Sequence, residues 1–132
     1  TLLMLAMVDG HAELAEALLR RGADTSLLTS DGSCYALGLA AVNGREKLVK
    51  LALRHGAEIN QRSRTTSCTA LMDAAYEGRE RVVHTLIRHG AEIDHQDNDD
   101  GTALIQAAAV GHPAVVRQLL RGGADMTLST MD

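Results

Sequence analysis

The sequence predicts an all-α solenoid built from four stacked helix–turn–helix repeats, and two observations support this fold class. First, the 132 residues include two Tyr but no Phe or Trp, so the chain lacks the bulky side chains of an ordinary globular core. Second, glycines recur with a period of 33 or 34 residues, which indicates units that become stable by stacking on their neighbours. The two periodic sets are Gly10, Gly44, Gly78 and Gly111, and Gly22, Gly56, Gly90 and Gly123.

The longer predicted helix of each repeat lies between its two glycines, which are 12 residues apart. Apolar residues occupy the fourth, fifth, eighth and ninth positions after the first glycine, a spacing that places them on one helical face. Pro113 suits a first helical turn, and the closing glycines suit a left-handed helix end. The four apolar stripes are Leu14, Ala15, Leu18 and Leu19; Leu48, Val49, Ala52 and Leu53; Val82, Val83, Leu86 and Ile87; and Val115, Val116, Leu119 and Leu120.

A shorter helix is predicted before the first glycine of each repeat. Thr1, Thr69 and Thr102 precede three of these helices as N-caps, whereas Tyr35 occupies this position in the second repeat and cannot cap in the same way. One apolar face with the spacing i, i+3, i+4 is small and nearly constant among the copies. Its members are Leu3, Ala6 and Met7; Leu37, Ala40 and Ala41; Leu71, Ala74 and Ala75; and Leu104, Ala107 and Ala108.

A second face of the short helix differs in every copy. Because the adjacent packing face is constant, this variation is what a recognition surface would show. The varied positions are Leu5, Val8 and Asp9; Leu39, Val42 and Asn43; Asp73, Tyr76 and Glu77; and Gln106, Ala109 and Val110.

Four motifs recur at equivalent places: Thr-x-Leu-x-x-Ala-Ala, Gly followed by His or Arg, Val-Val-x-x-Leu-Leu, and Gly-Ala followed by Asp or Glu. Together they resemble the ankyrin repeat family over all four units. The resemblance implies helix pairs joined by hairpin-like finger loops, a concave surface made by the fingers and the first helices, a protein-binding role and no catalysis. It also places Asn60 in a context where family members can be hydroxylated.

The chain is expected to form a single repeat domain over residues 1–132. We place the repeat units at about 1–28, 29–62, 63–95 and 96–128, with residues 129–132 starting a further repeat. Free-standing arrays need polar capping repeats, and neither end has one. We therefore expect further repeats to flank this segment in a longer parent protein.

The sequence departs from the family pattern at the start of each first helix, where the family's Thr-Pro-Leu-His lacks both Pro and His in every copy. Met4, Met72 and Ile105 replace the His in three repeats, which should shift stabilisation toward apolar packing. In the second repeat the replacement is Gly38, which we expect to leave a gap and to make this repeat the weakest.

Composition and charge exclude several functions. No apolar run approaches the roughly 20 residues that span a bilayer, and no secretory signal is present, so we expect an intracellular protein, cytoplasmic or nuclear, without membrane insertion. A net charge of -4 and two Tyr offer neither a basic footprint nor a stacking platform for nucleic acid. No nucleophile, phosphate-binding loop or paired carboxylates have the context of an active site, so neither an enzyme nor a cofactor is expected.

Cysteine, histidine and acidic residues suggest no further site. Cys34 and Cys68 are one repeat apart, and stacked helices about 8–10 Å apart are too distant for a disulfide, which needs Cα atoms roughly 4.4–6.8 Å apart. The six histidines have no metal-ligand spacing. The acidic run 94–101 fails as an EF-hand, because Gln96 and Ala107 would hold the positions that require Asp and Glu.

The leading hypothesis is a monomeric module that binds another protein or another segment of its parent chain. Tyr76 is the first candidate hot spot because it is an amphipathic aromatic residue on the varied face. The alternatives are a structural spacer and a regulatory ankyrin segment of a larger multidomain protein. The predicted partner-binding residues are Leu5, Val8, Leu39, Val42, Asn43, Arg62, Arg64, Asp73, Tyr76, Glu77, Asp97, Asp99, Gln106 and Val110, with the finger residues among them tuning specificity and association rate.

Overall fold

The computed structural model describes residues 1–129, which form eight α-helices in four consecutive pairs and no β-strand. Each pair holds a first helix, a turn at glycine and a second helix, as the sequence predicts. The sequence predicts that a further repeat starts at residues 129–132, and residues 130–132 of this segment lie outside the described residues. The pairs are α1 (Leu2–Asp9) with α2 (Ala12–Arg20), α3 (Ala36–Val42) with α4 (Glu46–Arg54), α5 (Ala70–Tyr76) with α6 (Glu80–Arg88), and α7 (Ala103–Val110) with α8 (Pro113–Arg121).

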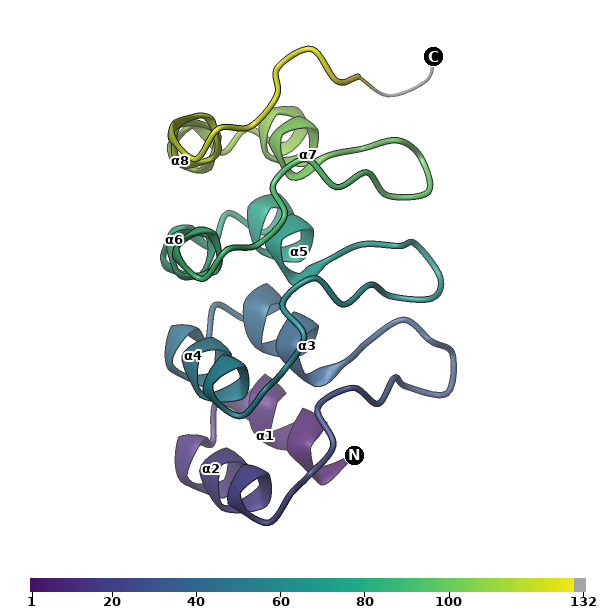
Figure 1. Ribbon diagram of the computed structural model, residues 1–132, viewed down its shortest axis with the longest axis vertical. Coiled ribbons are helices and arrows are strands. Elements are labelled where there is room, and N and C mark those ends of the chain that lie inside the picture. Colours follow the sequence, from purple (N-terminus) through teal and green to yellow (C-terminus); the bar gives the residue numbers. More distant parts are fainter. Residues whose placement is uncertain (130–132) are drawn as a thin grey trace.

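The pairs stack in chain order into an elongated solenoid (Figure 1). The first helices α1, α3, α5 and α7 form one column, and the second helices α2, α4, α6 and α8 form another, with each helix packed on its partner and on the next helix of its own column. The loops between repeats project to one side as fingers. Stability in such a stack comes from contacts within and between neighbouring repeats rather than from one central core.

The core is a thin layer that runs along the stack between the two columns. The small constant face of each first helix and the apolar stripe of each second helix are buried in the two inner repeats, apart from the partly buried Leu53 and Ile87. Short side chains such as Ala40 and Ala74, both 0% exposed, let neighbouring helices approach closely. The Ala-rich, aromatic-poor composition therefore has a structural cause.

Helix ends follow the sequence signals closely. Thr1, Thr69 and Thr102 each accept a hydrogen bond from the backbone N–H three residues later, at 3.1, 3.4 and 3.2 Å, whereas Tyr35 makes no such bond. Pro113 begins α8. The predicted caps are therefore confirmed.

The two ends of the described stack expose positions that the inner repeats bury. Leu14 of α2 is 46% exposed, whereas its repeat equivalent Leu48 in α4 is 2% exposed. Ala108 of α7 is exposed, whereas its equivalent Ala75 is buried. The difference arises because Leu48 and Ala75 have a neighbouring repeat on the side where Leu14 and Ala108 have none.

The expected gap at Gly38 does not exist, so this prediction is wrong. The ring of Tyr35 is 1% exposed and fills the space, and a Cβ built on Gly38 would lie 3.1 Å from the Tyr35 Cζ atom. The Tyr35 hydroxyl donates a hydrogen bond of 2.8 Å to the carbonyl of Gln61, which holds the ring in place. The large residue at the N-cap and the small residue three positions later are therefore one packing unit.

The fingers are joined by backbone hydrogen bonds within and between repeats. Within the second finger, the Ser63 N–H donates to the Cys68 carbonyl at 2.9 Å. Between fingers, the Arg64 N–H donates to the Gly32 carbonyl at 2.8 Å, and the Asn98 N–H donates to the Thr66 carbonyl at 3.0 Å. These bonds hold consecutive fingers in register beside the first helices.

Candidate functional site

The first helices carry an open hollow of about 370 Å³ whose lining includes α5. We call it the α5 hollow. Five of its lining residues belong to the partner-binding surface predicted from the sequence, and the other two, Thr66 and Cys68, come from the finger before α5. The seven residues are Val42, Thr66, Cys68, Asp73, Tyr76, Glu77 and Gln106.

Three consecutive repeats position these side chains. Asp73, Tyr76 and Glu77 have the spacing i, i+3, i+4, which places them on one face of the first helix of the third repeat. Val42 enters from the end of α3, and Gln106 enters from α7. The Tyr76 side chain is 53% exposed, so its ring is available to a partner.

Asp73 is the unusual group in the α5 hollow. Burial raises the pKa of its carboxyl from the ordinary value of 3.8 to about 7, and repulsion from Glu77 adds to the rise. No hydrogen bond or cation from residues 1–129 lowers this pKa. Asp73 in turn helps to raise the pKa of the Tyr35 hydroxyl and of the Cys68 thiol. None of these neighbouring groups is basic.

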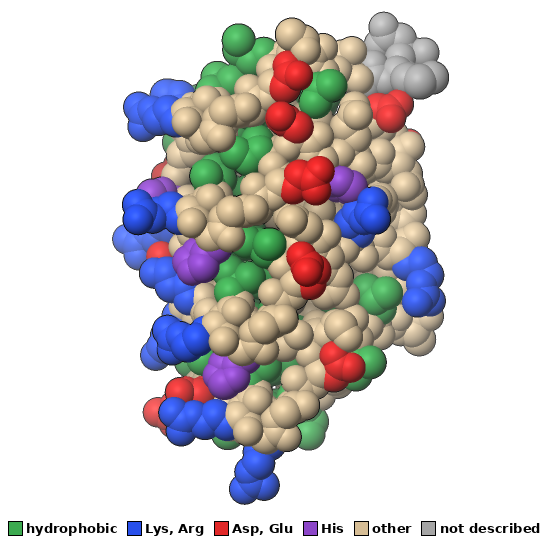
Figure 2. Space-filling model, in the orientation of Figure 1, with side chains coloured by type: hydrophobic (Ala, Val, Ile, Leu, Met, Phe, Trp, Pro, Cys, Tyr) green, Lys and Arg blue, Asp and Glu red, His purple; other side chains and the backbone are tan. Residues whose placement is uncertain are grey.

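Other aspartates of the chain show the opposite behaviour. Asp24 and Asp125 follow second helices and accept hydrogen bonds from Ser26 and Thr127, which lower the pKa of both carboxyls. Figure 2 shows acidic side chains one above another through the middle of one face, beside basic and histidine side chains along the edge formed by the second helices. The carboxylates of Asp24 and Asp125 thus accept hydrogen bonds from residues of a local turn, whereas burial dominates at Asp73.

The wall of the α5 hollow beside α7 is organised by Asp97. Its Oδ1 atom accepts the N–H groups of Asp99 and Gly101 at 2.9 and 2.8 Å, and its Oδ2 atom accepts the Gln106 Nε2 at 2.8 Å. The Cys68 thiol also points to Oδ2, at 3.8 Å. Asp97, expected on the partner-binding surface, therefore uses its carboxylate to tie the third finger to α7.

The remaining predicted residues lie apart from the α5 hollow or beside it. On the first helices, Leu5 and Val110 are 61% and 45% exposed, whereas Val8 and Leu39 are partly buried. Asn43 donates to the Leu39 carbonyl at 2.8 Å and so completes the end of α3.

Arg62, Arg64 and Asp99 are exposed on the fingers. Within residues 1–129, no ion pair links these arginines to the acidic residues of the next finger.

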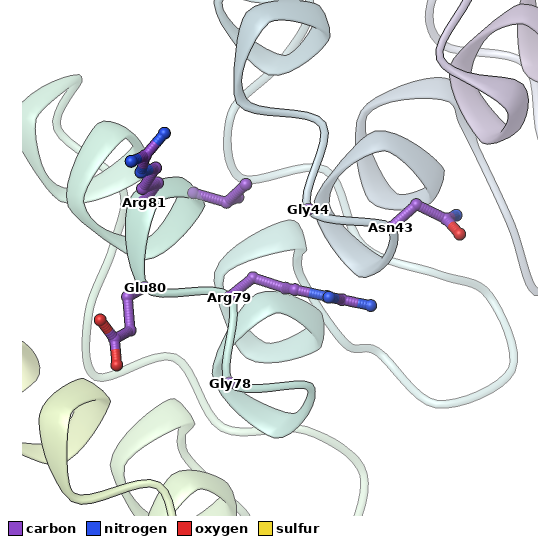
Figure 3. Close-up of a pocket in the computed structure, with 7 residues that line it drawn as sticks. Asn43, Gly44, Gly78, Arg79, Glu80 and Arg81 are labelled. Atoms are coloured by element: carbon purple, nitrogen blue, oxygen red, sulfur yellow. The ribbon is translucent and has the colours of Figure 1, made fainter.

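A second hollow lies at the turns between α3 and α4 and between α5 and α6, and Figure 3 shows residues that line it. Arg79 extends across it toward the end of α3, where its Nε atom donates to the Val42 carbonyl at 2.9 Å. Arg45 makes the equivalent bond to the Val8 carbonyl, and His112 approaches the Tyr76 carbonyl at 2.9 Å. These side chains cross the turns to join adjacent repeats, so this hollow belongs to the scaffold.

Residues 1–129 offer no metal-binding cluster, no disulfide and no membrane-spanning helix. No group of three or more His, Cys, Asp or Glu is placed to hold a metal ion among residues 1–129. Cys34 and Cys68 are free thiols. None of the eight described helices has the length and apolar character needed to cross a membrane.

Comparison with known proteins agrees with the repeat architecture. A family model described as ankyrin repeats in three copies matches residues 2–97 and 67–130, which together cover nearly the whole chain. No curated protein matches the chain.

Proposed function

The chain belongs to the ankyrin repeat family, whose repeats are generally protein–protein interaction modules without catalysis of their own, and we propose that it binds a partner through the α5 hollow and the fingers beside it. The partner is another protein or another segment of the parent chain. Exposure of Tyr76 at 53% beside a hollow built by three repeats is the observation that carries this proposal.

The physical argument concerns the kind of surface that Tyr76 provides. An aromatic ring with a polar end contributes a large contact area with little conformational entropy to lose, which is why tyrosine is enriched among binding hot spots. The ring stands at the rim of a hollow that also offers Val42 as an apolar wall. A partner side chain placed in the hollow would bury both.

The test is a selection of short random peptides displayed on phage against the wild-type chain, followed by calorimetry with the selected peptides. We expect Tyr76→Ala to weaken binding by about 2 kcal/mol or more, as hot-spot truncations do. Leu120→Ala is the matched control, because Leu120 is an exposed apolar residue on α8, 37% exposed and outside the α5 hollow. Peptides that bind Tyr76→Ala as tightly as wild type would refute this site, and the absence of any peptide would favour the structural-spacer alternative.

A further inference from the structure

We propose that the α5 hollow receives a cationic side chain of the partner, a lysine or an arginine, with its charged end against Asp73 and Glu77 and its aliphatic stem along Val42 and Tyr76. This inference rests on the proposed function and specifies the chemistry of the partner. It depends on the shape of the hollow, on its supply of hydrogen-bond acceptors and on its charge.

The geometry suits a side chain that is apolar along its length and charged at its end. Val42 and the exposed ring of Tyr76 provide an apolar wall, and a ring face attracts a cation as well as a methylene stem. Asp73 lies on α5 and Glu77 is the C-cap residue four positions later, with helical backbone angles, so both carboxylates lie on the same face. A long basic side chain can therefore contact the ring and reach both carboxylates.

Donors of the polar groups in the hollow are directed away from Asp73. The Gln106 amide directs an N–H group, and the Cys68 thiol its S–H group, to Asp97. The Thr66 hydroxyl pairs with the Ser63 hydroxyl at 2.6 Å and accepts the Cys68 N–H at 3.3 Å. A partner that enters the hollow must therefore bring the hydrogen-bond donor that Asp73 lacks.

The charge of the hollow also favours a cation. The titratable groups that surround Asp73 are Glu77 at the C-cap of α5, Cys68 before α5 and Tyr35 before α3, and none of them is basic. Burial raises the pKa of the Cys68 thiol and of the Tyr35 hydroxyl, so both groups stay neutral and the negative charge of the hollow comes from the two carboxyls. Removing a carboxylate from water without a partner is unfavourable, and an opposite charge with good geometry offsets that penalty. An acidic partner side chain would add repulsion, and a neutral one would leave the negative charge uncompensated.

The experiment is a double-mutant cycle on peptides selected against the wild-type chain, measured by calorimetry at pH 8, where Asp73 is charged. In each peptide, each arginine is replaced in turn by citrulline, its neutral isostere, and each lysine by norleucine. The protein is either wild type or Asp73→Asn. We expect that neutralising one basic residue of the peptide weakens binding to the wild-type protein about tenfold, or about 1.4 kcal/mol. The same change should weaken binding to Asp73→Asn less than twofold.

Glu13→Gln is the control for a general loss of negative charge, since Glu13 is exposed on α2 and outside the hollow. It should leave the affinity within twofold. Peptides that require Tyr76 but show no coupling to Asp73, or that lose as much affinity with Glu13→Gln, would overturn the inference and leave the proposed function standing. Peptides that bind independently of Tyr76, or no peptides at all, would overturn both.

Discussion

Replacing Asp73 by asparagine should change how the stability of the chain depends on pH. The folded protein binds the Asp73 proton more tightly than the unfolded chain, because the pKa is about 7 in the fold against an ordinary value of 3.8. The raised pKa therefore stabilises the folded wild type. This contribution is fully present below the pKa that Asp73 has in the unfolded chain, and it is lost as the pH rises through the pKa that Asp73 has in the folded protein. The variant has no such titration, so its stability relative to wild type should increase with pH.

The size of the effect follows from the two pKa values. With a folded pKa of 7, the free energy of unfolding of Asp73→Asn minus that of wild type should rise by about 2.6 kcal/mol between pH 5 and pH 8. Asp73 is partly exposed, so solvent screening reduces the rise below this value. Any constant penalty for burying the amide cancels, because only the change with pH is used.

The measurement is urea unfolding followed by circular dichroism at several pH values for wild type and for Asp73→Asn. Asp99→Asn is the matched control for the loss of one carboxyl group, because Asp99 is exposed on a finger and lies outside the α5 hollow. Parallel profiles for Asp73→Asn and wild type would show that the carboxyl is not desolvated. A difference that falls with pH would show that the fold stabilises its anion, and either result refutes the reasoning.

Two further predictions concern packing and are checked by the same unfolding measurements. Gly38→Ala should destabilise the chain by about 1 kcal/mol, although this change in a helix is usually favourable, because the new methyl group meets the Tyr35 ring 3.1 Å away; a gain in stability would show that the ring gives way. Leu48→Ala should cost about 2–5 kcal/mol and the repeat-equivalent Leu14→Ala less than about 1 kcal/mol, because the two side chains are 2% and 46% exposed. Equal losses would contradict the exposure of the first repeat.

Most of the fold could be predicted because its signals are local and repeated. The apolar periods, the three threonine caps and the glycines each depend on residues within one repeat, and each appears several times. Gly38 shows the limit of comparing repeats position by position. The other repeats have larger residues there, which suggested a gap, but the compensating Tyr35 lies three positions earlier.

The candidate site could be predicted on the helices and not on the fingers. The varied helical face included Val42, Asp73 and Tyr76, because helical spacing determines which residues share a face. Thr66 and Cys68 were missed, because no periodic pattern indicates where a loop lies relative to a helix. The role of Asp97 was missed for the same reason, because its hydrogen bond with Gln106 joins a finger to the following helix.

The sequence by itself determined the repeat unit, its helices and the face of each first helix that varies, since these depend on interactions between residues close in the chain. Only the tertiary structure decided that Asp73 is desolvated and lacks a hydrogen-bond donor within residues 1–129. That property arises where α3, α5, α7 and a finger meet. Stacking places this carboxyl in a hollow built by three repeats, and its partial burial there, which no single repeat can produce, makes Asp73 distinctive.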